Sequence, residues 1–176
     1  GCADAIAATS DRLGPIDILV CNHGIGSSKE RVVWEQDPAV WRETMDINLD
    51  GPFHLSRLVL KTMTKQRYGR IVYTSSTAGL VAEPAGSAYN TSKHGLLGLM
   101  RSVALDAGAY GVTSNAVLPG WVRTEMAEVS ACREAEDRGI TVDQVWQERE
   151  ALYPAARVVT PEEVAAMIAF LAAEEA

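Results

Sequence analysis

Tyr89 and Lys93 form a Tyr-x-x-x-Lys pair, and Ser76 stands thirteen residues before the tyrosine. Four residues make about one helical turn, so we expect the phenol and the ammonium on one face of a helix. A free tyrosine has a pKa near ~10, and a lysine cation beside it favours the phenolate and lowers that value. Ser76 adds a hydroxyl that can donate to a carbonyl oxygen. The three residues therefore suit proton transfer coupled to hydride transfer at a carbonyl.

Each of these motifs taken alone favours a structural interpretation. Any amphipathic helix can carry Tyr-x-x-x-Lys on its solvated face, and a Ser-Ser pair after a strand is common. The catalytic interpretation needs a tyrosine pKa lowered by ~3 units, or roughly 4 kcal/mol of differential interaction, which one close cation in a partly desolvated cleft can supply. The surrounding sequence must therefore decide between the structural and the catalytic interpretation.

Helices and strands alternate along the chain, without internal repeats. We predict helices over residues 3–13, 38–66, 87–109 and from 161 onward, and strands over 16–21, 70–74 and 112–118. Gly51-Pro52 predicts a kink in the long second helix, near Asn48. Residues 16–21 form a short, nearly continuous apolar run, as in a strand that is buried on both faces. This alternation predicts a parallel sheet with helices on both faces.

Five motifs surround the Ser-Tyr-Lys set. They are ILVCNHG (18–24), DINLDG (46–51), GRIVYTSS (69–76), YNTSK (89–93) and NAVLPGWVRT (115–124). Their order and spacing resemble the short-chain dehydrogenase/reductase family over essentially the whole chain. The resemblance implies an α/β fold with a Rossmann-like, doubly wound parallel sheet. That sheet is incomplete here, with about three of the family's seven strands, so residues 1–176 read as a single partial catalytic domain.

The resemblance also implies a role for each site residue. Tyr89 is the general acid or base, and Lys93 lowers its pKa and holds the nicotinamide ribose. Ser76 positions the substrate oxygen, and Asn48 helps to hold a water molecule that links Lys93 to solvent. The implied cofactor-binding residues are Asn22, Gly24, Asn48, Tyr89, Lys93, Pro119, Gly120, Val122 and Thr124. Residues 121–156 match the family's substrate lid, although an ordinary surface helical hairpin would also explain their pattern.

The implied activity is that of an NAD(P)-dependent oxidoreductase that interconverts a secondary alcohol and a ketone, or a 3-oxoacyl/3-hydroxyacyl-type substrate. The choice between NAD and NADP stays open. The positions that anchor a carboxylate in related 3-hydroxyacid dehydrogenases match Gly26, Ala78 and Gly86, which argues against a small hydroxy acid. The alternative hypothesis is an inactive truncated fragment that acts only as an oligomerising or binding module.

The family's Gly-rich G-x-x-x-G-x-G turn, whose helix N-terminus receives the cofactor pyrophosphate, is missing from residues 1–176. We therefore expect these residues in isolation to be inactive. Members of the family commonly pair through the helices that carry Asn48 and Tyr89, and we expect the same of the full-length protein. Leu97 and Leu105 are the apolar positions that we expect to be exposed for such a homodimer or homotetramer.

The composition of the chain argues against several classes of binding partner. A net charge of −7 argues against nucleic acid and against an anionic membrane. No apolar run approaches the ~20 residues of a membrane span. The three cysteines form no metal or redox motif, which favours a reducing compartment and a cytoplasmic location. The three histidines lack ligand-like spacing, so we expect no metal site.

Overall fold

The computed structural model describes residues 1–26 and 31–176. Its α-helices are α1 (Cys2–Leu13), α2 (Pro38–Met45), α3 (Gly51–Gln66), α4 (Ser87–Ala107), α5 (Glu125–Arg138), α6 (Val142–Ala151) and α7 (Pro161–Ala172), and its strands are β1 (Ile18–Cys21), β2 (Gly69–Thr74) and β3 (Val112–Val117). Short 3-10 turns, η1 (Val33–Glu35), η3 (Thr77–Gly79) and η4 (Gly108–Tyr110), and one π-helical segment, η2 (Asp46–Asp50), complete the elements.

The three strands form one parallel sheet in the order β1-β2-β3. Ile18 lies opposite Arg70, and Gly69 lies opposite Val112, which fixes the register of both pairs. The predicted strands agree with the observed ones to within two residues at each end. This arrangement confirms the expected α/β fold with a parallel sheet.

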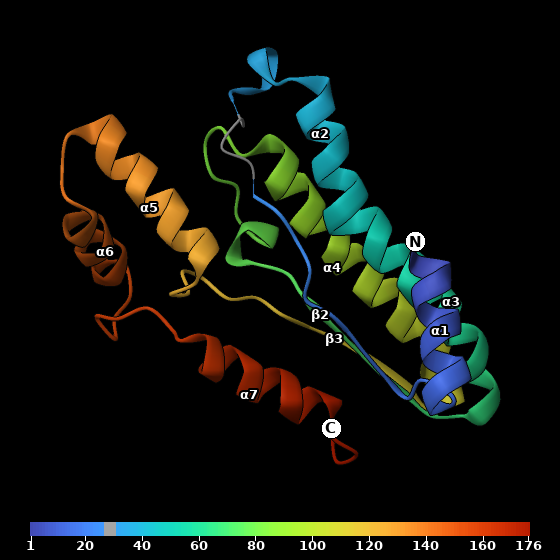
Figure 1. Ribbon diagram of the computed structural model, residues 1–176. Helices are drawn as coiled ribbons and strands as arrows, with labels where there is room; N and C mark the ends of the chain where they lie inside the picture. Colours follow the sequence, from blue (N-terminus) through green and yellow to red (C-terminus); the bar gives the residue numbers. More distant parts are fainter. Residues whose placement is uncertain (27–30) are drawn as a thin grey trace. The chain divides into compact units, whose positions relative to one another are not determined.

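Helices α3 and α4 cover one face of this sheet (Figure 1). The buried core on this face consists of Cys21, Val59, Met63, Ile71, Tyr73, Leu96, Val103, Ala107 and Val112. Alternate residues of β2, Ile71 and Tyr73, belong to this core, as the two-residue period of a strand requires. Leu96 and Val103 of α4 belong to this core, so their face of the helix packs against the sheet.

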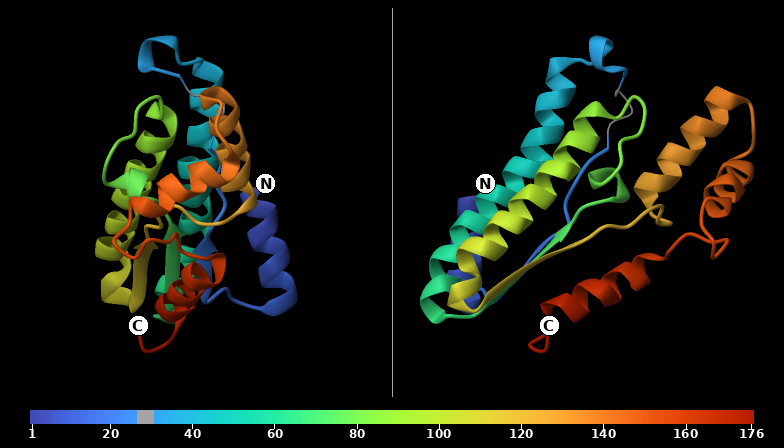
Figure 2. Two further views of the ribbon diagram at one scale, coloured as in Figure 1. Left: turned by 90° about the vertical axis from the view of Figure 1, so that its left-hand side faces the viewer. Right: turned by 180° about the vertical axis from the view of Figure 1, so that it is seen from behind.

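The opposite face of β2 contacts the C-terminal end of the chain. Arg70 is 7% exposed, and its guanidinium donates to the backbone carbonyls of Ala173 at 3.1 Å and Glu174 at 3.0 Å. Figure 2 shows residues 168–176 on the side of the strands away from α3 and α4. The sheet therefore has chain packed on both faces, as in a doubly wound fold.

The predicted long helix is interrupted rather than simply kinked. Asp37 caps α2 by accepting from the Ala39 N–H at 2.8 Å, and Pro38 follows at the first helical position. The π-helical residues of η2 separate α2 from α3, and Pro52 stands in the first turn of α3. The irregularity therefore falls on the residues around Asn48.

Leu97 contradicts the expectation that it is exposed, because only 3% of its surface is accessible, whereas Leu105 is 84% exposed. The reason lies in the neighbours of α4. This helix packs against β3 on one side and against α2 and η2 on another, so a second stripe of the helix is buried within the chain. Leu105 lies beyond both contacts.

The chain divides into two compact units, residues 1–118 with 168–176, and residues 119–167. The second unit contains α5 and α6, which pack as a hairpin around a core of their own made by Ala127, Ala131, Ala135, Val145, Trp146 and Val158. Thr160 and Glu163 form a capping box at the start of α7, with reciprocal bonds of 2.9 and 3.3 Å, and this supports the helix predicted from residue 161 onward.

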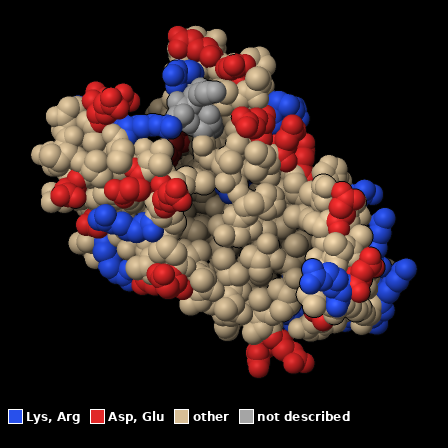
Figure 3. All heavy atoms as spheres, viewed as in Figure 1, with Lys and Arg blue, Asp and Glu red and all other residues tan. Residues whose placement is uncertain are grey.

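Surface charge is mixed. On the face drawn in Figure 3, Lys and Arg lie interspersed with Asp and Glu among the coloured residues. Within residues 1–26 and 31–176, no helix is both long enough and apolar enough to cross a membrane.

Candidate active site

Ser76 is the second residue after β2, at the carboxyl end of the sheet. It caps the short turn η3, and its Oγ accepts from the Ala78 N–H at 3.1 Å. The preceding Ser75 donates from its Oγ to the Lys93 carbonyl at 3.0 Å, so the end of β2 is tied to α4. A Cβ at Gly79 would lie 2.7 Å from the Ser75 Oγ. Glycine at this position therefore lets η3 approach the helix that carries Tyr89 and Lys93.

Lys93 extends from α4 back to the end of β2. Its Nζ donates to the Thr74 carbonyl at 2.9 Å, and it lies 5.5 Å from the centroid of the Tyr89 ring. Lys93 is 4% exposed. Since Tyr89 and Lys93 are one turn apart, the ring and the ammonium meet on the same face of α4, as the spacing predicts.

Burial lowers the pKa of Lys93 to about 8. The ammonium is therefore still mainly protonated at pH 7. Among the described residues, Thr74 provides an acceptor for one of its three N–H donors. The others remain available for a ligand hydroxyl or for water.

Asn48 is held in the middle of the π-helical segment η2 by three hydrogen bonds. Its Oδ1 accepts from the Ile25 N–H at 2.7 Å, and its Nδ2 donates to the Ile25 carbonyl at 2.8 Å and to the Ser92 Oγ at 3.1 Å. Asn48 is 1% exposed. Single-turn π segments inside helices are frequent at functional sites, and this one places Asn48 between the loop after β1 and α4.

Gly24 packs closely against Asn48 and Lys93. A Cβ built at Gly24 would lie 3.3 Å from the Asn48 Oδ1 and 3.3 Å from the Lys93 Nζ. A side chain there would therefore crowd both polar groups. Glycine at this position therefore lets the loop after β1 pass close to both polar groups.

Thr74 joins two of the predicted site residues, and the sequence interpretation missed it. Its carbonyl accepts from Lys93, and its Oγ1 donates to the Asn22 Oδ1 at 2.8 Å. Ile25 and Ser92 were also missed, although both bind Asn48. The contacts of Thr74 with Lys93 and of Ile25 with Asn48 use backbone carbonyls, and the residue type does not reveal such contacts. Ser92 could have been found, because it lies within the Tyr-x-x-x-Lys motif itself.

His23 and Cys21 flank the candidate cofactor residue Asn22. A Cβ at Gly51 would lie 2.9 Å from the His23 Nε2, so glycine at position 51 makes room for the imidazole beside the π segment. Cys21 is 1% exposed in the core, and burial raises the pKa of its thiol to about 12. The thiol is therefore protonated near neutrality and acts as an apolar filler.

The remaining predicted cofactor residues lie in the second unit. Pro119 and Gly120 open that unit, and Val122 forms a parallel backbone bridge with Val159. Thr124 caps α5 by accepting from the Ala127 N–H at 3.3 Å. The structure therefore brings Asn48, Lys93 and Tyr89 together with Gly24 in the first unit, and keeps the segment 119–124 ordered within the second.

Comparisons with known proteins agree with one another. A family model described as enoyl-(acyl carrier protein) reductase matches residues 1–176. The chain is 39% identical over 176 residues to a D-beta-hydroxybutyrate dehydrogenase from Rhizobium meliloti (strain 1021), and the match covers 99% of this chain and 67% of that protein. It is 34% identical over 171 residues to the 3-oxoacyl-[acyl-carrier-protein] reductase FabG from Vibrio cholerae serotype O1, with 97% and 65% covered.

A solved structure is similar over the same extent. The F189W actinorhodin polyketide ketoreductase with NADPH is 32% identical, with a TM-score of 0.92, and the match covers 99% of this chain and 67% of that one. The chain thus spans about two thirds of the length of the proteins that it matches.

Proposed function

Because the chain belongs to the short-chain dehydrogenase/reductase family, we propose that it is the catalytic part of an NAD(P)-dependent oxidoreductase that interconverts a secondary alcohol and a ketone. The observation that carries this proposal is the position of the Lys93 ammonium. It donates to the Thr74 carbonyl at 2.9 Å, lies 5.5 Å from the centroid of the Tyr89 ring, and lies beside the bare backbone of Gly24. A buried cation beside a phenol is the arrangement that general acid–base chemistry at a carbonyl requires.

The bound nicotinamide supplies or accepts the hydride in this chemistry. Tyr89 gives a proton to the substrate oxygen during reduction and takes it back during oxidation. Ser76 donates to the same oxygen and polarises the carbonyl. The turn at η3 supports this role, because it holds Ser76 at the end of β2 while Ser75 is fixed to the α4 backbone.

Lys93 has two tasks in the proposed reaction. Its charge favours the phenolate of Tyr89, and its unused donors hold the ribose hydroxyls of the nicotinamide end. Asn48 fixes the loop at Ile25 and so maintains the space in which water connects Lys93 to solvent. Proton exchange with solvent then resets Tyr89 after each turnover.

The proposed cofactor contacts come from four places in the chain. They are Asn22 and Gly24 after β1, Asn48 in η2, Tyr89 and Lys93 on α4, and Pro119, Gly120, Val122 and Thr124 after β3. Val122 would contact the carboxamide through its backbone. The choice between NAD and NADP depends on the adenosine side of the cofactor, which these residues do not contact.

We propose a 3-oxoacyl or 3-hydroxyacyl thioester, or another neutral ketone, as the substrate. Gly26, Ala78 and Gly86 stand at the positions that would anchor a free carboxylate, and none has a polar side chain. A site without a charged partner loses little by accepting a neutral ester and gains little from a carboxylate.

The test is ketone-dependent oxidation of NADH and of NADPH by the full-length protein. We expect kcat/KM for a 3-oxoacyl thioester to exceed that for the matching free 3-oxo acid by at least about tenfold. Turnover of the free acid at an equal or greater kcat/KM would contradict the substrate class. The absence of oxidation with every carbonyl tested would contradict the proposed function.

A further inference from the structure

The segment 120–124, which the proposed function assigns to the nicotinamide, is tied to α6 and the turn after it. The Trp121 N–H donates to the Tyr153 hydroxyl at 2.8 Å. A Cβ built at Gly120 would overlap that same hydroxyl. Glycine therefore allows the phenol to reach the backbone of the segment.

The side chains of this segment join an alternating stack of cations and indoles. The Arg149 guanidinium carbon lies 3.7 Å from the centroid of Trp121 and 5.0 Å from that of Trp146. Arg123, which follows Trp121 by two residues, lies 4.2 Å from the Trp146 centroid. Two residues of the segment thus contact two residues of α6. Such cation–π contacts are strongest when they are desolvated, and Arg149 is only 4% exposed.

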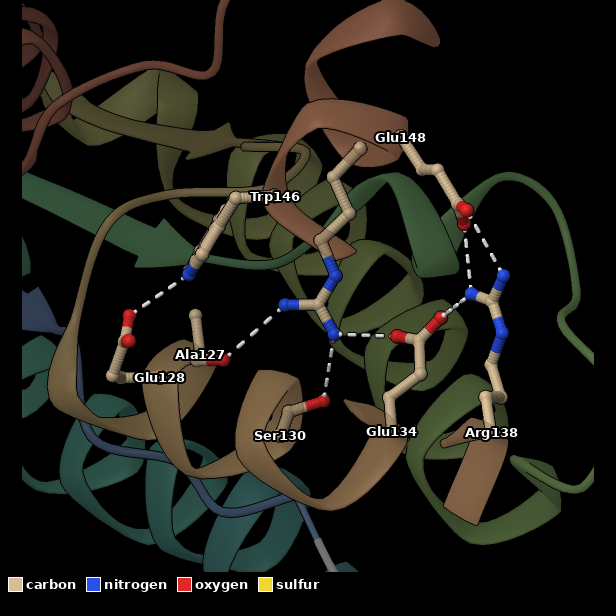
Figure 4. A network of polar contacts seen from close by, with 8 residues as sticks. Ala127, Glu128, Ser130, Glu134, Arg138, Trp146 and Glu148 are labelled. Carbon is tan, nitrogen blue, oxygen red and sulfur yellow. Dashed lines mark hydrogen bonds and ion pairs between the residues drawn. The ribbon is translucent and has the colours of Figure 1, made fainter. Parts of the chain in front are cut away.

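The guanidinium of Arg149 also forms hydrogen bonds with α5. It donates to the Ala127 carbonyl at 3.2 Å, to the Ser130 Oγ at 3.2 Å and to Glu134 at 2.9 Å. Figure 4 shows that Glu134 is also bonded to Arg138, which pairs with Glu148 on α6. The guanidinium that contacts Trp121 is therefore also bonded to α5 of the hairpin.

Backbone contacts complete the attachment. Val122 bridges to Val159, the Arg123 N–H donates to the Val159 carbonyl at 3.4 Å, and the Arg123 side chain pairs with Glu150 at 3.3 Å. Trp121, Val122 and Arg123 are thus each attached within the second unit. Order in the hairpin and order in the segment are therefore linked.

We propose that Tyr153 and Arg149 are positioning residues that hold the segment 120–124 in its cofactor-binding conformation, so that the hairpin α5–α6 controls affinity for the nicotinamide end of the cofactor. This inference rests on the proposed function, which assigns Val122 and Thr124 to the cofactor. Neither Tyr153 nor Arg149 touches the reacting atoms in this account. They act only through the backbone and the indole of Trp121.

Hydrogen–deuterium exchange of the Trp121 backbone amide tests the attachment without cofactor. Tyr153→Phe removes the acceptor and leaves the ring, so we expect the Trp121 amide to exchange about tenfold faster while amides in β2 keep their rates. Tyr110→Phe is the matched control, because Tyr110 lies in the first unit and contacts Arg67 through its ring. Unchanged exchange at Trp121 in Tyr153→Phe would overturn the inference.

Cofactor affinity and turnover of the full-length protein test the consequence. We expect Tyr153→Phe to raise Kd and KM for NAD(P)H by about tenfold with kcat retained, and Arg149→Lys, which keeps the charge but loses the flat stack on Trp121, to act in the same direction. Faster Trp121 exchange with an unchanged Kd would overturn the positioning role alone. A wild-type protein that binds no cofactor would instead overturn the proposed function.

Discussion

Burial disfavours the charged form of Lys93, whereas the proposed function of this residue requires the charge. The residue is 4% exposed, and this burial disfavours the charged ammonium and lowers the pKa of Lys93 to about 8. The group is still mainly cationic at pH 7, as its proposed effect on Tyr89 requires. The Thr74 carbonyl offsets part of the cost of burying the charge.

This burial predicts a pH-dependent stability. Because the folded-state pKa lies below the unfolded value of ~10.4, the unfolded chain binds more protons between about pH 8 and pH 10.4, and the contribution of Lys93 to the free energy of unfolding rises with pH in that window. Relative to Lys93→Met, the wild type should gain about 3 kcal/mol from pH 7.5 to 10.5. Urea unfolding at several pH values measures the difference.

The difference in unfolding free energy between the wild type and Lys93→Met excludes the contributions of other groups that titrate at alkaline pH, because both proteins share those groups. Burial also raises the pKa values of Cys21 and Tyr73 to about 12, so both lower the stability of every variant above about pH 9. Lys65→Met, at an exposed site on α3, is the control and should show no such window. A wild-type advantage over Lys93→Met that stays constant with pH would contradict the assigned cause.

At the scale of elements, the π segment η2 gives Asn48 its position. A regular helix from Asp37 to Gln66 would turn the residues after Met45 differently, and the side chain would not meet Ile25 and Ser92 together. The buried bond of 2.6 Å between the Ser56 and Tyr73 hydroxyls, with Ser56 donating to the Pro52 carbonyl, ties the start of α3 to β2.

Asn48→Asp should destabilise the protein. The carboxylate keeps an acceptor for the Ile25 N–H but loses both donors, and it places a buried charge against the Ile25 carbonyl. We expect a loss of about 2–4 kcal/mol in the free energy of unfolding at pH 7. The matched control is Asn22→Asp, an exposed site where the carboxylate still accepts from Thr74, so the loss should stay below about 1 kcal/mol. Equal losses at both positions would be the contrary result.

The sequence predicted most elements because apolar periodicity and capping residues are local. Strand 70–74 and the helix that begins at residue 161 were found in this way. The π segment was not, because Gly51-Pro52 signals an irregularity but not its kind. Burial of Leu97 was missed for another reason, since it depends on α2, which is far away in the sequence.

The sequence also predicted only part of the candidate site. Side chains in motifs, such as Tyr89 and Lys93, could be named from spacing. The Thr74 carbonyl and the backbone of Ile25 could not, because backbone groups carry no residue signal. The contact of Tyr153 with Trp121 joins residues 32 positions apart and needed the fold of the hairpin.

At the scale of the whole molecule, α4 presents an apolar residue to solvent. Leu105 is 84% exposed, and we predict that a symmetric copy covers it in the full-length protein. Leu105→Glu should therefore lower the molar mass found by light scattering toward that of a monomer. Leu152→Glu, at a 72% exposed leucine of the second unit, should leave the mass unchanged. A wild-type monomer at micromolar concentration would contradict the prediction.

Residues 1–176 expressed alone should bind cofactor weakly and aggregate. Among the described residues, β1 and β3 each pair along one edge only, and Ile18 and Val20 of β1 are 46% and 40% exposed. Unpaired edges with apolar side chains promote association, and the Gly-rich turn that binds pyrophosphate is missing from the sequence. Calorimetric titration and light scattering test this. Micromolar cofactor affinity in a monodisperse sample would contradict it.

We propose that Tyr89 transfers the proton at the substrate oxygen, and one variant tests this most directly. Tyr89→Phe in the full-length protein removes the phenolic hydroxyl and keeps the ring beside Lys93. We expect kcat for ketone reduction to fall by at least about a hundredfold, while Kd for NAD(P)H changes less than about threefold, since only the proton transfer is lost. Retention of near-normal kcat by Tyr89→Phe would contradict the account.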